Sequence, residues 1–113
     1  MARTIDLNIT IDQGATFEQL VQVLDQDRDP VNLTGFSGVG EVRDTYGGSL
    51  LATFTVSVTT PATGYVKFSL TPTSTGALSF TTPAVYDVDV VSGTVRYRVA
   101  RGTATLALKV NQL

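Results

Sequence analysis

Short segments of alternating polarity recur along this 113-residue chain. In residues 4–11, Ile5, Leu7, Ile9 and Ile11 alternate with polar residues. A period of two predicts a strand with one buried face. Comparable segments follow, with turn signals about every 8–12 residues, at residues 15–24, 36–43, 50–58, 64–70, 84–91 and 94–110. The pattern favours an all-β fold, an antiparallel sandwich of seven to eight strands.

Turns and glycines refine this prediction. The pairs Gly47-Gly48 and Ser92-Gly93 each predict a tight hairpin. Residues 71–80 are the one stretch of any length without β character, and we expect a brief helical turn there that begins near Pro72 and packs Leu78 under the sandwich.

Other glycines predict how the layers pack. Gly38 and Gly40 fall on the inward side of their strand and leave room for large residues of the opposite sheet. Gly102 interrupts the long segment 94–110, where we expect a bulge or a switch between sheets. Leu20 and Leu24 oppose the inward residues of the second strand, so we expect that strand to be covered on both sides.

Length and composition indicate a single domain over residues 1–113. Apolar residues make up 42% of the chain and charged residues 16%, below the roughly 25% usual in globular domains. The net charge of −2 argues against a nucleic-acid partner, because phosphate binding needs a basic stripe. The basic cluster Arg96, Arg98 and Arg101, with Tyr97 among them, is interpreted as a solvated strand face.

No cysteine, export signal or long apolar run occurs, so we expect synthesis in a cytoplasm and no membrane partner. Histidine is also absent, which removes the common nucleophilic triads. Asp87 and Asp89 are the candidate carboxylate pair of a glycosidase. Two outward acids on one strand are ordinary solubilising residues, so we expect no enzyme and no catalytic, cofactor or metal site.

Two further patterns have features of binding sites. Asp25, Asp27 and Asp29 have the spacing of a calcium loop, but Pro30 and Phe36 stand where an EF-hand needs glycine and glutamate. A loose calcium site and a solvated acidic turn remain as alternatives. Tyr46, Tyr65 and Tyr97 are the one plausible aromatic platform for a carbohydrate-binding module. Tyr86 is interpreted as a core residue with one hydroxyl hydrogen bond, or as a tyrosine corner.

Several motifs, taken in order, resemble one family. Gly14-Ala15-Thr16-Phe17 is similar to a G-x-T-F opening, and residues 25–36 are similar to a D-x-x-G-x-P-x-D-L-T-G-Y element. The motifs that complete the order are residues 41–44, 64–70, 74–78 and 84–88. Together they resemble the N-terminal immunoglobulin-like domain of phage baseplate upper proteins and similar small virion domains. The resemblance implies an immunoglobulin-like antiparallel β-sandwich.

The resemblance also implies a function. It leads us to expect a non-enzymatic virion structural protein in a phage tail, baseplate or neck, a homo-oligomer that also binds other virion proteins. A capsid decoration protein and a carbohydrate-binding module are the alternatives. Residues 1–8 and 107–113, both terminal and apolar, are the segments expected to lie along a neighbouring subunit.

Overall fold

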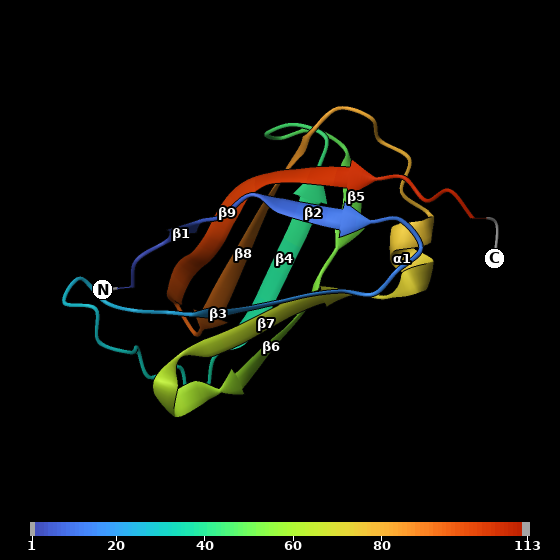
Figure 1. Cartoon of the computed structure of the whole chain (residues 1–113). Coiled ribbons are helices and arrows are strands. Elements are labelled where there is room, and N and C mark those ends of the chain that lie inside the picture. The colour runs from blue at the N-terminus through green and yellow to red at the C-terminus, as the bar shows by residue number, and fades with distance from the viewer. Residues whose placement is uncertain (1, 112–113) are drawn as a thin grey trace.

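The chain folds into an immunoglobulin-like β-sandwich, seen here in a computed structural model that describes residues 2–111 (Figure 1). Its strands are β1 (Ile5–Asp6), β2 (Ile9–Asp12), β3 (Phe17–Gln22), β4 (Ser37–Arg43), β5 (Leu50–Thr53), β6 (Thr55–Thr60), β7 (Tyr65–Leu70), β8 (Ala84–Ser92) and β9 (Val95–Ala107). The helical elements are a 3₁₀ turn, η1 (Pro61–Thr63), and the short helix α1 (Pro72–Gly76). The predicted all-β fold class is confirmed.

Two sheets form the layers of the sandwich. The larger has the order β1-β9-β8-β4-β5, with β2 also on β9, and the smaller has the order β3-β7-β6. The orders β9-β8-β4 and β3-β7-β6 match the G-F-C and B-E-D arrangement of immunoglobulin domains. All strand pairs are antiparallel except that β1 and β2 run parallel to β9. No hairpin joins these two segments, so no turn imposes antiparallel pairing on them.

Within residues 2–111, the expected count of seven to eight strands corresponds to nine strands on seven continuous segments, because two segments are interrupted. The first is broken between β1 and β2, and the other between β5 and β6 at Phe54. At Phe54 the chain leaves the larger sheet and joins the smaller one. Phe54 is buried, and its N–H donates to the carbonyl of Gly40 at 2.9 Å. This crossing of the chain at Phe54, the sheet switch, therefore links the two layers covalently.

Aromatic side chains fill the centre of the sandwich. Phe54 and Phe68 meet edge to face at a centroid distance of 5.1 Å, and Phe17 and Tyr86 pack against them at 5.8–6.0 Å. The glycines of β4 make room for this layer, as predicted. A Cβ on Gly38 would lie 2.2 Å from Val56 Cγ1, so only glycine fits there.

Both predicted hairpins and the predicted helical turn are present, and the hairpin at Ser92-Gly93 is tight, whereas residues 44–49 form a longer loop around Gly47-Gly48. Thr71 caps α1 by accepting a hydrogen bond from Ser74 N–H at 3.2 Å, and Pro72 occupies the first turn. The Thr75 hydroxyl donates to the carbonyl of Ala15 at 2.7 Å, and Leu78 is buried. The helix thereby closes one end of the sandwich (Figure 1).

Two expectations about packing are wrong. Leu20 is 51% exposed, because the outer face of the smaller sheet is uncovered at that strand. Gly102 is not a bulge: β9 continues through it, and the register shift lies at Val99, between the pairs Val88–Ala100 and Asp89–Arg98. Gly102 instead lets the first segment approach, since a Cβ there would lie 2.3 Å from the carbonyl oxygen of Leu7.

Tyr86 holds the first segment, which contains β1 and β2, against the larger sheet through a hydrogen bond. Its hydroxyl donates to the carbonyl of Leu7, while Leu7 N–H donates to the carbonyl of Arg101 at 2.9 Å. A tyrosine corner bonds to backbone a few residues upstream, so that interpretation is wrong and core packing with one hydroxyl bond is confirmed. Burial, with a smaller contribution from Asp6, raises the pKa of Tyr86 to about 12.

We expect Tyr86→Phe to lower the free energy of unfolding by about 1–2 kcal/mol, because the Leu7 carbonyl loses its donor. An unfolded tyrosine ionises near pH 10, below the folded pKa of about 12. The unfolded state therefore loses its proton first, and the stability supplied by the neutral phenol falls as the pH rises between these values. Urea unfolding at pH 7, with absorbance titration at 295 nm, checks both points. If the absorbance titration of Tyr86→Phe kept the most alkaline step of the wild type, that step would not belong to Tyr86.

Candidate functional site

The outer face of the larger sheet gathers charged side chains. Cross-strand pairing aligns Glu41 with Asp87, Asp87 with Arg101, and Arg101 with Asp6. We call this surface the charged face; its charged members are Asp6, Glu41, Arg43, Asp87, Asp89, Arg96, Arg98 and Arg101. Four acids and four arginines give the face a formal net charge of zero. It carries eight of the chain's 18 charged residues and four of its eight Lys and Arg residues.

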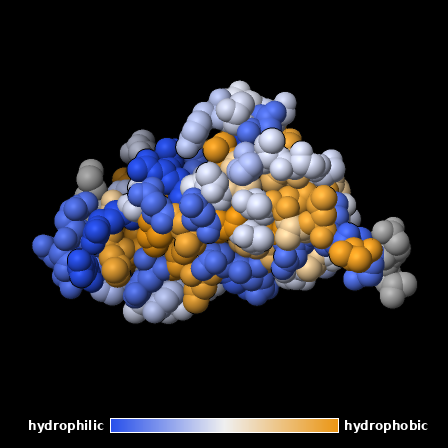
Figure 2. Space-filling view, turned by 45° about the horizontal axis from the view of Figure 1, so that its top comes forward, coloured by the Kyte–Doolittle hydropathy of each residue, from blue (hydrophilic) through white to orange (hydrophobic). Residues whose placement is uncertain are grey.

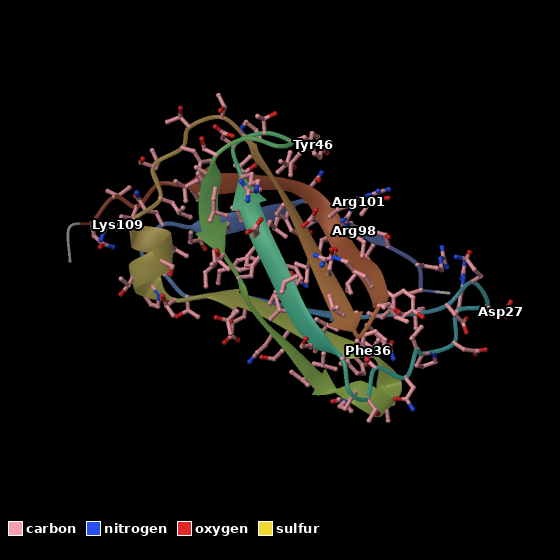
Figure 3. All side chains as sticks on the ribbon, turned by 180° about the vertical axis from the view of Figure 1, so that it is seen from behind. Asp27, Phe36, Tyr46, Arg98, Arg101 and Lys109 are labelled. Atoms are coloured by element: carbon pink, nitrogen blue, oxygen red, sulfur yellow. The ribbon has the colours of Figure 1, made fainter. Side chains whose placement is uncertain are left out.

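The bulge at Val99 determines which side chains of β9 lie on the charged face. Arg96 and Arg98 point outward by simple alternation, whereas Arg101 lies an odd number of residues further on. Because Val99 and Ala100 are both buried, the alternation shifts by one residue and Arg101 also points outward. Figure 3 shows Arg98 and Arg101 near each other along β9. All three arginines of the predicted cluster therefore share a face.

Asp89 is the centre of the charged face. Its side chain is only 3% exposed, and it accepts from Arg96 Nε at 2.7 Å and from Arg98 Nε at 3.0 Å. Burial alone would raise the pKa of Asp89, but the hydrogen bonds from Arg98 and Arg96 and their charge outweigh it and hold the pKa below its usual value. Asp89 in turn raises the pKa of Arg98. The two arginine side chains remain about half exposed and cover the carboxylate.

The expectation that Asp87 and Asp89 are both ordinary outward acids is wrong for Asp89, which is buried. Asp87 is half-exposed, and Arg98 lies between the two carboxylates, 3.7 Å from Asp87 and 3.0 Å from Asp89. Glycosidase carboxylates face each other across a sugar-binding cleft. These two instead flank one guanidinium on the outer face of a sheet, which is the geometry of an ion-pair network.

The other arginines are also paired with acids. Arg101 Nε lies 2.9 Å from Asp6, and Arg43 lies 3.0 Å from Glu41. Arg43 also donates to the carbonyl of Gly48 at 2.7 Å, which ties the β4–β5 hairpin to the sheet. The arginine cluster is thus part of a neutralised network, and no guanidinium of the charged face lacks a carboxylate partner.

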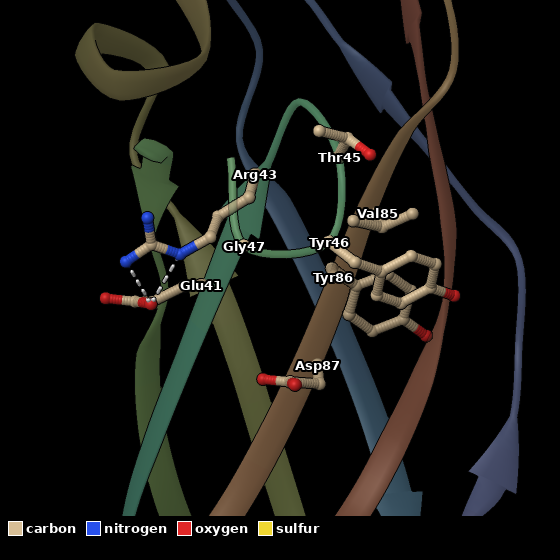
Figure 4. A pocket seen from close by; sticks show the side chains of 8 residues that line it. All are labelled: Glu41, Arg43, Thr45, Tyr46, Gly47, Val85, Tyr86 and Asp87. Carbon is tan, nitrogen blue, oxygen red and sulfur yellow. Dashed lines mark hydrogen bonds and ion pairs between the residues drawn. The ribbon is translucent and has the colours of Figure 1, made fainter. Parts of the chain in front are cut away.

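A small pocket of about 110 Å³ lies between the β4–β5 hairpin and β8. Figure 4 shows the Arg43–Glu41 ion pair on one side of it and Tyr46 with Asp87 on the other. Tyr46 is 86% exposed at the hairpin tip. Ligand pockets usually measure about 300–1,000 Å³. This pocket is large enough for one side chain of a partner.

The predicted aromatic platform is not formed. Tyr46 lies on the β4–β5 hairpin, Tyr65 begins β7 in the other sheet, and Tyr97 stacks on Phe36 with a centroid distance of 5.6 Å. Figure 3 shows Tyr46 and Phe36 toward opposite ends of the sheet. The three tyrosines therefore offer no common surface to a sugar.

The acidic loop is organised by its own backbone. Asp25 Oδ1 accepts from the N–H groups of Asp27 at 2.8 Å and Asp29 at 3.0 Å, and Arg28 takes a left-handed conformation with φ of 66°. This is an Asx-type turn. Across residues 2–111, no group of three or more His, Cys, Asp or Glu side chains is arranged to hold a metal ion.

The two terminal segments differ in how they lie. Within residues 1–8, the described part pairs inside its own chain, through Arg3 N–H to the carbonyl of Leu24 at 2.8 Å and through β1. In the C-terminal segment after β9, Lys109 N–H donates to Gln13 Oε1 at 3.2 Å, while Leu108 is 57% and Val110 94% exposed. Figure 2 shows hydrophobic residues gathered toward this end. Met1 and residues 112–113, which belong to the segments expected to make contacts, lie outside the described residues.

The fold and the charged face define an immunoglobulin-like β-sandwich with an ion-paired outer surface. No protein-family model matches the chain, and no curated protein matches it either. In the part of the chain that the structure describes, no helix is long and apolar enough to cross a membrane.

Proposed function

We propose that this protein is a non-enzymatic structural protein of a phage virion, placed in the tail, baseplate or neck. The observation that supports the proposal is the order in which the phage-like motifs fall on one immunoglobulin-like sandwich. Gly14, with φ of 80°, turns the chain from β2 into β3, and Gly35, with φ of 85°, precedes β4. Both glycines belong to the motif elements of the resemblance and adopt a backbone conformation that favours glycine.

The mode of action is contact through rigid surfaces. The charged face is ion-paired and formally neutral, so a complementary neighbour meets preformed charges whose geometry is fixed by Asp89. Preorganised surfaces lose little conformational entropy when they dock, and arranged charges select the partner and its orientation. Such a domain serves as an adaptor between copies of itself and other virion proteins.

Capsid decoration is the alternative within the same class. Decoration and tail proteins require the same kind of docking surface and differ in the part of the particle that they occupy.

The experiment is immunogold electron microscopy of particles released by cells that carry the gene, with an antibody against the recombinant protein. We expect label at the tail, baseplate or neck, whereas label over the head would favour decoration. Particles of a gene-disrupted strain serve as the control. Absence of the protein from purified particles, checked by mass spectrometry, would overturn the proposal.

A further inference from the structure

The pocket between the β4–β5 hairpin and β8 carries an unbalanced charge. Its charged lining residues, two acids and one arginine, give it a formal charge of −1, although the charged face as a whole is neutral. The two acids, Glu41 and Asp87, stand directly opposite each other on β4 and β8. Like charges in directly opposed positions of a sheet repel each other. A cation beside both carboxylates would relieve this repulsion.

Asp87 has unused capacity to accept hydrogen bonds. Its side chain is 49% exposed, and within residues 2–111 its carboxylate accepts no hydrogen bond. Arg98 Nε lies 3.7 Å from it and donates instead to Asp89 at 3.0 Å. Arg101, the neighbour of Asp87 on β9, pairs with Asp6 at 2.9 Å. A charged donor from outside the chain can therefore bond to Asp87 without displacing a bond that the fold uses.

Arg43, the basic residue among those that line the pocket, is held away from Asp87. Its Nε and Nη2 donate to Glu41 Oε1 at 3.2 and 3.0 Å, and its Nη1 donates to the carbonyl of Gly48 at 2.7 Å. Figure 4 shows this ion pair on the side of the pocket across from Asp87. In the described part of the chain, Glu41 Oε2 accepts no hydrogen bond. Each of the two acids thus keeps at least one oxygen for a donor that enters the pocket.

Tyr46 adds an aromatic ring to the rim of the pocket. The residue is 86% exposed, and within the described chain its hydroxyl makes no hydrogen bond and its ring stacks on no other ring. Figure 4 shows it on the same side of the pocket as Asp87. The face of an aromatic ring attracts cations, and arginine is its more frequent partner in proteins. The volume of about 110 Å³ accommodates the end of one long side chain.

We propose that this pocket binds an arginine side chain from the surface of a different protein. A planar guanidinium can stack on Tyr46 while its N–H groups, which point in several directions, donate to Asp87 and to Glu41 Oε2. A lysine ammonium is a compact charge without a flat face, so it fits this combination less well. The biological use of the pocket rests on the proposed function, in which the arginine belongs to a virion neighbour, whereas arginine binding in solution does not.

The charges of the chain itself exclude its own copy as the source of the arginine. Four of its arginines are paired with acids on the charged face. The other two are Arg28, within the acidic loop of residues 25–30, and Arg3, which is bonded to Leu24 beside that loop. Docking either of them would press Asp25, Asp27 and Asp29 against a pocket that is already negative. Like charges brought together in this way oppose association.

The test is an NMR titration of the isotope-labelled full chain with N-acetyl-arginine methylamide. The matched probe is N-acetyl-citrulline methylamide, which keeps the shape of the arginine side chain and lacks its charge. We expect saturable shifts at residues 45–47 and 85–87 with a dissociation constant on the order of 1–10 mM for the arginine probe. The corresponding lysine probe should bind at least about threefold more weakly, and the citrulline probe should give no saturable shift.

Two variants test the assigned roles. Asp87→Asn and Tyr46→Ala alter exposed groups, so we expect both to fold, and each should weaken arginine binding at least about threefold. The matched control is Glu18→Gln, which removes one acid from β3 in the smaller sheet and should bind like the wild type. Circular dichroism verifies that each variant is folded.

Three results would overturn the inference. They are equal binding of the arginine and citrulline probes, wild-type affinity in folded Asp87→Asn, and shifts that fall on the acidic loop while residues 45–47 and 85–87 stay unchanged. Particle labelling tests the virion function separately, so failure of the arginine site and failure of that function give different results.

Discussion

Replacing both Arg96 and Arg98 by methionine should lower the free energy of unfolding at pH 7 by about 3–5 kcal/mol, because a buried carboxylate would lose its partners. Methionine keeps an apolar stem over Asp89 and supplies no donor. The carboxylate, 3% exposed in the native protein, would then be covered but unpaired. Urea unfolding followed by circular dichroism measures the change.

The pH dependence of this variant should have the opposite sign to that of the wild type. In the wild type the pKa of folded Asp89 lies below the unfolded value of about 3.9, so its contribution is present above that value and is lost as the pH falls through the folded pKa. Without the arginines, burial would raise the pKa of Asp89 above the unfolded value. Stability would then fall as the pH rises through the folded pKa.

The matched control adds Asp89→Asn to the double variant. It removes the unpaired charge, so we expect it to recover part of the lost stability at pH 7 and to show no pH slope from this position. A double variant as stable as the wild type at pH 7, or one with the wild-type pH slope, would show that the arginines do not hold Asp89.

Gly102→Ala should destabilise the fold by about 2–3 kcal/mol, because the new Cβ would lie 2.3 Å from the oxygen and 2.8 Å from the carbonyl carbon of Leu7. These are backbone atoms, held by Tyr86 and by Arg101, so they do not move aside as a flexible side chain would. Amide exchange should report faster opening of β1 and β2 than of the smaller sheet.

Gly76→Ala is the matched control for this prediction. Gly76 lies in α1, and a Cβ there would make ordinary contact, 3.7 Å from Gly14 Cα. Alanine in a helix is about 0.5–1 kcal/mol more favourable than glycine, so we expect an unchanged or slightly higher stability. Equal stability of the two alanine variants would mean that the first segment does not dock tightly at Gly102.

Local pattern was sufficient to predict much of the fold. Alternating polarity predicted the inward faces of β7 and β8, and turn chemistry predicted both hairpins and the helical turn at Pro72. Features that depend on contacts between distant segments could not be predicted from local pattern. The parallel docking of β1 and β2 on β9 and the sheet switch at Phe54 depend on the order of strands in the sheets, which alternation does not encode.

The sequence contains a signal for the buried, ion-paired state of Asp89, although alternating polarity alone does not reveal it. The hairpin at Ser92-Gly93 places Asp89 opposite Arg98, within reach of Arg96. That register places two arginine side chains beside Asp89 and so indicates a covered, ion-paired acid. The bulge at Val99, which brings Arg101 to the same face, has no comparable mark, because bulges that do not use glycine depend on packing on both sides of the strand.

The parallel docking of the first segment on β9 has a mechanical consequence. Along the 45 Å axis, the chain enters beside β1 at one end and leaves after β9 at the other (Figure 1). Tension between the ends would therefore load the β1–β9 and β2–β9 ladders in shear, so that their hydrogen bonds share the force and rupture together. Antiparallel terminal strands would instead unzip one bond at a time. This geometry suits a component that must carry load.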